Sequence, residues 1–110
     1  MQTIVELPEF LKKSDKLLTD SERQSIINYL ASHPVSGVLI QGTGGIRKLR
    51  WSAQGKGKGG GVRVVYYYHN ETMPLFLLTV FGKGEKANLS KSERNKLASL
   101  MLLLRNNYGA

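Results

Sequence analysis

Basic side chains are concentrated in one short stretch of the sequence, where they could bind a polyanion. Six basic residues and no acidic residue lie between positions 46 and 63: Arg47, Lys48, Arg50, Lys56, Lys58 and Arg63. Like charges at this density repel one another unless an anion neutralises them. The stretch therefore favours a phosphate-bearing partner, above all RNA. The alternative is a charged face that is only solvated.

Alternation along the strand expected at residues 46–51 sorts its side chains onto two faces. Lys48 and Arg50 project from one face, whereas Leu49 and Trp51 project from the other and are expected to face the core. Two more cations belong near the first face, because one begins the next strand and the other follows the strand after that: Arg63 and Lys83. We therefore expect cations from separate segments to converge on one face of a sheet.

A glycine-rich segment, SAQGKGKGGG at residues 52–61, separates two strand-like runs. Three of its glycines fit the dinucleotide-binding pattern G-x-G-x-x-G, but that pattern must open a helix, and here a strand follows. The glycines instead allow the backbone to approach a phosphate closely, with Lys56 and Lys58 beside it. The alternative is a flexible hairpin loop with solvated lysines.

Four further side chains are candidates for contact with RNA. Arg47 and Lys86 are basic, and the Tyr67 ring could stack on a base. His69 lies at the end of the same tyrosine-rich strand, close to the basic residues. For both rings, packing within the sheet or core is the alternative.

Composition narrows the class of protein further. Residues 46–110 hold twelve basic and three acidic residues, a net charge of +9, whereas residues 1–45 have a net charge of −1. There is no cysteine, and no pair of carboxylates has a spacing typical of catalysis or metal binding, so we expect neither a metal nor a cofactor. The length favours one domain spanning residues 1–110. No signal peptide or membrane segment is visible, which favours the cytoplasm.

The pattern of apolar residues and capping signals predicts an α+β domain with the order β-α-α-β-β-β-α. A capping box formed by Thr19 and Glu22 begins the second helix, and a second box formed by Ser90 and Glu93 begins the last one. Residues 34–45 are expected to be a connection. The strands are expected at residues 2–6, 46–51, 62–69 and 75–81, in a mostly antiparallel sheet. Two helices would cover one face, with the last helix at an edge or on the other face.

Three segments resemble the RelE/HigB-type toxins of bacterial toxin–antitoxin pairs, and most closely a HigB-like subgroup. They read IQGTGGIRKLRW, GKGKGGGVRVVYYY and LFLLTVFGKGE, and they occur in the order and spacing of that family. The resemblance implies a RelE-like fold and a metal-independent endoribonuclease that cuts mRNA in the ribosomal A site. It also implies a cognate antitoxin that restrains this activity.

The resemblance assigns catalytic roles to six cations, matched position by position: Lys48, Arg50, Lys56, Lys58, Arg63 and Lys83. Arg63 matches the arginine after the glycine that opens its strand, and we expect it to bind the phosphate. One of the lysines at positions 48, 56 and 58 would act as general acid or base. This chain departs from many family members at Gly84, where they have arginine, and it has no tyrosine in residues 85–92.

Two other functions are compatible with these features. A non-catalytic RNA- or ribosome-binding module would account for the charge without any cleavage. A DNA-binding regulator is disfavoured, because the basic residues lie on strands and a loop and no helix-turn-helix is evident.

Overall fold

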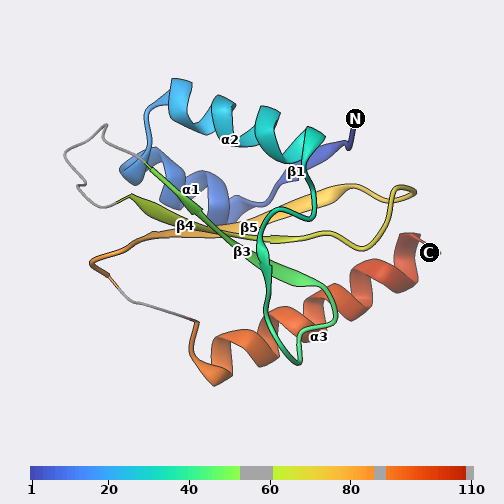
Figure 1. Ribbon diagram of the computed structural model, residues 1–110. Helices are drawn as coiled ribbons and strands as arrows, with labels where there is room; N and C mark the ends of the chain where they lie inside the picture. Colours follow the sequence, from blue (N-terminus) through green and yellow to red (C-terminus); the bar gives the residue numbers. More distant parts are fainter. Residues whose placement is uncertain (53–60, 86–88, 109–110) are drawn as a thin grey trace.

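The computed structural model describes residues 1–52, 61–85 and 89–108, and it has three layers (Figure 1). Helices α1 (Pro8–Leu17) and α2 (Asp20–Ser32) cover one face of a sheet, and helix α3 (Lys91–Tyr108) covers the other. The strands are β1 (Ile4–Glu6), β2 (Val38–Leu39), β3 (Ile46–Trp51), β4 (Val62–Tyr67) and β5 (Leu75–Gly82). This is the predicted α+β architecture, with α3 on the face opposite to α1 and α2.

The sheet has the order β1-β5-β4-β3-β2. Strand β1 is parallel to β5, and the other neighbours are antiparallel. One strand was not predicted: β2 lies within the stretch expected to be a plain connection. Only Val38 and Leu39 pair there, with Lys48 and Arg47 of β3. Two exposed residues are too few to show an alternation of apolar and polar side chains, so the sequence does not indicate a strand here. They form one only because they pair with β3.

The helix boundaries follow from the predicted caps. The backbone N–H of Glu22 donates to Thr19 Oγ1 at 3.1 Å, and the Thr19 N–H donates to Glu22 Oε1 at 2.9 Å. The same reciprocal pair joins Ser90 and Glu93 at the start of α3. Each box satisfies two backbone donors that the first turn leaves without partners.

Apolar side chains form one cluster on each face of the sheet. The cluster beneath α1 and α2 includes Phe10, Ile26, Leu30, Val64, Tyr66 and Leu77. The cluster beneath α3 includes Ile46, Val65, Tyr67, Phe76, Leu78 and Met101. Leu11 of α1 and Leu100 of α3 lie outside these clusters and are 44% and 40% exposed. No described helix is long and apolar enough to cross a membrane.

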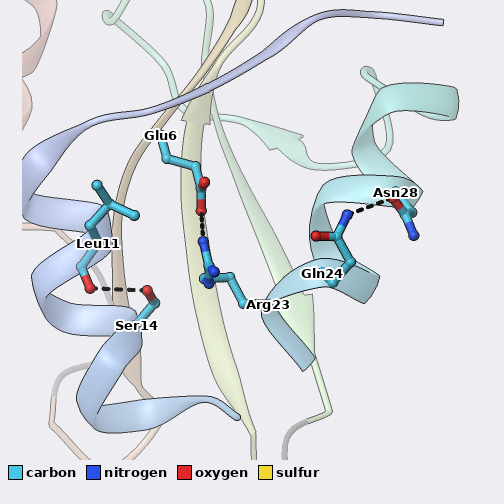
Figure 2. A network of polar contacts seen from close by, with 6 residues as sticks. All are labelled: Glu6, Leu11, Ser14, Arg23, Gln24 and Asn28. Carbon is cyan, nitrogen blue, oxygen red and sulfur yellow. Dashed lines mark hydrogen bonds and ion pairs between the residues drawn. The ribbon is translucent and has the colours of Figure 1, made fainter. Parts of the chain in front are cut away.

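Polar contacts fix α2 and the segment that carries β2. Figure 2 shows Arg23 of α2 reaching Glu6 of β1, with Nη1 and Oε1 2.7 Å apart. This hydrogen bond raises the pKa of Arg23, and the negative charge of Glu6 raises it further by a smaller amount. On the same side of the sheet, the buried Tyr66 hydroxyl donates to Pro34 O and accepts from Gly37 N, both at 2.8 Å. Tyr66 thereby ties the segment before β2 to the centre of the sheet.

Candidate nucleic-acid interface

The pairing of β3 with β4 places three predicted cations on one face of the sheet. Arg50 lies directly opposite Arg63, and Lys48 lies opposite Val65. Val65 belongs to the apolar cluster beneath α3. Because neighbouring residues at one register position share a face, the side chains of Lys48, Arg50 and Arg63 lie on the α3 side of the sheet.

Two of these cations meet a third at the end of the sheet. A pocket of about 200 Å³ is lined by Arg50, Trp51, Ser52, Arg63 and Lys83, and we call it the cation pocket. None of these five residues is acidic. Arg50 and Lys83 are exposed and Arg63 is half-buried, so their charges are accessible to a ligand. The arrangement can hold a phosphate, because two guanidinium forks and an ammonium surround one space.

A glycine and a backbone hydrogen bond close the sheet at this pocket. Gly61 has a φ of +81°, and a Cβ built there would lie 2.4 Å from Trp51 O. The Lys83 N–H donates to Gly61 O at 3.2 Å. Gly61 therefore allows β4 to begin close beside the end of β3, and Lys83 is held next to the start of β4. This local geometry brings Lys83 to Arg63.

Lys48 lies beside a second, larger depression at the edge of the sheet. This depression, of about 520 Å³, is lined by Ser36, Val38, Lys48, Leu49 and Arg50, and we call it the edge groove. Arg50 lines both spaces. The cation pocket and the edge groove are therefore neighbours, and together they contain four of the six cations predicted to be catalytic.

The chain matches no protein-family model. Its structure is similar to a solved structure of a mutant of the E. coli toxin RelE in the free state. The TM-score is 0.57 and the sequence identity 17%, and the match covers 91% of this chain and 96% of that chain. The fold is RelE-like. The similarity extends over nearly the whole of both chains, and it does not distinguish a HigB-like subgroup.

Within this RelE-like fold, Arg47 lies away from the cation pocket. It points to the α2 side of the sheet and donates to Gly37 O at 2.9 Å and Val35 O at 3.3 Å. Its Nε is buried and has no hydrogen-bond partner in the described part of the chain. Arg47 thus holds the segment before β2, and its role in RNA binding stays a prediction.

Tyr67 and His69 differ sharply in exposure. The Tyr67 ring is fully buried, so it offers no free face to a base, and core packing is the role that the structure gives it. Burial raises the pKa of the Tyr67 phenol, although the charge of Arg105 lowers it. His69 is exposed, and its ring is parallel to that of Tyr67 with centroids 6.3 Å apart. The remaining predicted cations, Lys56, Lys58 and Lys86, lie outside the described residues.

Sequence reasoning missed the contribution of Trp51 and Ser52 to the pocket. Trp51 was assigned to the core alone, yet this half-buried residue both packs against the α2-side cluster and lines the cation pocket. Trp51 is the last residue of β3, and this position at the end of the sheet could have indicated that it also borders the pocket. Among the described residues, no three histidine, aspartate or glutamate side chains form a metal-binding group.

Proposed function

We propose that this chain is the toxin of a toxin–antitoxin pair and cleaves mRNA on the ribosome. The observation that carries the proposal is the meeting of Arg50, Arg63 and Lys83 around one pocket at the end of a RelE-like sheet. The solved structure with the same fold is itself described as a toxin. The resemblance of the three sequence segments to the same family is independent support.

The proposed reaction uses the 2′-OH of the RNA as nucleophile. Its oxygen attacks the adjacent phosphorus, the bond to the 5′-oxygen of the next nucleotide breaks, and a cyclic phosphate and a 5′-OH result. A base takes the proton of the 2′-OH, and an acid gives a proton to the departing oxygen. Negative charge grows on the phosphoryl oxygens during this step. Cations already fixed around those oxygens lower the barrier.

The positions of the side chains suggest how these roles are divided. Arg63 is half-buried on β4 and is the proposed phosphate-binding residue, with Arg50 and Lys83 on either side of it. Lys48 lies next along the same face, in the edge groove, and is one candidate for the acid or base. The need for a 2′-OH would restrict cleavage to RNA.

The proposed partners follow from the same chemistry. The ribosome supplies both a polyanionic surface and the mRNA, so the protein would act in the cytoplasm. A cognate antitoxin would need an acidic segment to neutralise the strongly basic second half of the chain. It could act by covering the cation pocket or by preventing entry into the ribosome.

A toe-printing experiment in a purified translation system tests the proposal. We expect wild-type protein to give new mRNA 5′ ends at codons in the A site, and Arg63→Ala to give none. Lys12→Ala changes an exposed lysine of α1 and is the matched control, which should cut like wild type. A ribosome-binding module without catalytic activity would stall translation and leave the mRNA intact. That outcome would replace the nuclease with a binding function.

A further inference from the structure

On the α2 side of the sheet, three aromatic rings form a row between β3 and the end of α2, and we call this row the stack. The rings of His33 and Tyr29 are stacked, with centroids 4.5 Å apart and 19° between their planes. Tyr29 in turn meets Trp51 edge-on, with centroids 5.5 Å apart. Trp51 and Tyr29 are half-buried, whereas His33 is exposed. The stack therefore starts at the core and ends in an exposed imidazole.

Hydrogen bonds hold the stack in position. The Tyr29 and Ser36 hydroxyls are 2.8 Å apart. The His33 backbone N–H donates to Tyr29 O at 2.9 Å, and its Nδ1 lies 3.1 Å from the same oxygen. His33 also precedes Pro34, which restricts its backbone. Rings that are fixed before binding lose less conformational entropy when a ligand stacks on them.

The stack is connected to the predicted phosphate-binding residues by two routes. Trp51 lines the cation pocket. Ser36, which contacts the Tyr29 hydroxyl, lines the edge groove together with Lys48. In addition, β2 pairs with β3 only at Arg47 and Lys48. Beyond that point no described strand covers the edge of β3, so a chain leaving the cation pocket can cross this edge and reach the rings.

We propose that His33, Tyr29 and Trp51 form a stacking site for an unpaired base of the RNA whose phosphate occupies the cation pocket. Single-stranded RNA offers both a phosphate and an uncovered base. Here the cations lie on the α3 side of the sheet and the rings on the α2 side, and Trp51 at the end of β3 borders both. Every base has a π face, so such a site tolerates different sequences and selects for single strands. This site rests on the proposed function, because it requires RNA in the cation pocket.

Trp51 provides a direct readout, since it is the single tryptophan of the chain. The first probe is a 2′-O-methyl hexaribonucleotide, which lacks the 2′-OH nucleophile and therefore stays intact. The second probe has the same backbone but carries no bases. We expect the wild type to bind the first probe on the order of tenfold more tightly than the second, with a change in Trp51 emission. His33→Ala should remove this difference, and His33→Phe should retain it. Ser25→Ala, an exposed change elsewhere on α2, should behave like wild type.

The controls separate this inference from the proposed function. His33→Ala changes an exposed side chain, and its melting temperature would establish that it is folded. If His33→Ala keeps the preference for the base-containing probe while Arg63→Ala loses affinity for both probes, the stacking site is wrong and the RNA-binding surface stands. If the wild type binds neither probe, the stacking site is wrong, and the toe-printing experiment on the ribosome decides the proposed function independently.

Discussion

Arg50 and Arg63 lie directly opposite each other on β3 and β4, and both line the cation pocket. Like charges at directly opposed positions destabilise an antiparallel pair. The fold tolerates this repulsion at the place where the chain would bind a phosphate. We therefore expect Arg63 to contribute to phosphate binding and not to the stability of the fold. Both effects can be measured on the same variant.

The first prediction concerns stability in the absence of RNA. Arg63→Ala removes one of the two opposed charges, so its free energy of unfolding should equal or exceed that of wild type, by no more than about 1 kcal/mol. Adding inorganic phosphate should raise the melting temperature of wild type more than that of the variant, because the wild-type pocket binds the anion more tightly. Thermal melts with and without phosphate provide the measurement. A strongly destabilised Arg63→Ala protein would show that the arginine has a structural role.

The same substitution should remove most of the cleavage activity. A fixed donor aimed at developing negative charge typically contributes a factor of about 10²–10³ to the rate. Arg63→Ala should therefore slow single-turnover cleavage of ribosome-bound mRNA by that factor, with the protein still folded. Lys83→Ala removes a cation on the other side of the pocket and should show a smaller loss in the same assay. Full activity in both variants would contradict the placement of the phosphate.

Salt dependence tests how many cations contact the RNA backbone. For single strands, the logarithm of the affinity falls with the logarithm of salt concentration, with a slope of about −0.7 for each phosphate neutralised. If Arg50, Arg63 and Lys83 each neutralise one phosphate, the slope for a short single-stranded RNA should be about −2. Arg63→Ala should make it less steep by about 0.7. An affinity that does not change across a salt series would refute the polyanion site.

Much of the fold was predictable because its signals are local. The caps at Thr19 and Ser90 and the exact extent of β3 are found as expected. The alternation of Lys48 and Arg50 against Leu49 and Trp51 also holds. What the sequence could not indicate depends on distant partners. Strand β2 exists only through β3, and Trp51 becomes part of the pocket only because Gly61 lets β4 start beside it.

The burial of Tyr67 also depends on segments that are distant in the sequence. Tyr66 and Tyr67 are adjacent and point to opposite faces, and alternation alone would expose one of them. Both are fully buried, because α1 and α2 cover one face of the sheet and α3 covers the other. A sheet covered on both sides leaves its central strands no exposed face.

These two tyrosines form a matched pair for a stability experiment. The Tyr66 hydroxyl has two hydrogen-bond partners, whereas the buried Tyr67 hydroxyl has none in the described part of the chain. Tyr66→Phe leaves Pro34 O and Gly37 N without this partner and should cost about 1–3 kcal/mol. Tyr67→Phe should be neutral or slightly stabilising. Urea denaturation of both variants measures the difference, and equal effects would contradict the assigned bonding.

The pH dependence of stability should follow from the same residues. Burial raises the pKa of Tyr66 above its usual 10.0, although the hydrogen bond from Gly37 and the charge of Arg47 lower it. A raised pKa in the folded state means that the folded protein favours the neutral phenol. The contribution of Tyr66 is therefore complete below pH 10 and is lost as the pH rises from about 10 through the folded-state pKa. Wild type should lose stability faster than Tyr66→Phe in this range, as measured by urea titrations at pH 9 and above.

The last prediction concerns the proposed antitoxin, whose position on the toxin decides how it neutralises the activity. The basic second half of the chain predicts an acidic segment in the partner, and the exposed Leu102 and Leu103 of α3 show that apolar contact is also available. Hydrogen exchange of the toxin with and without the co-expressed partner separates the two modes. Protection on β3 and β4 would indicate that the partner covers the cation pocket. Protection confined to α2 or α3 would indicate that it blocks entry into the ribosome from a distance.

In both cases the partner should restore growth, because either mode keeps the cation pocket from the mRNA. The absence of any neighbouring gene product that relieves growth arrest would argue against a toxin and in favour of an RNA-binding module.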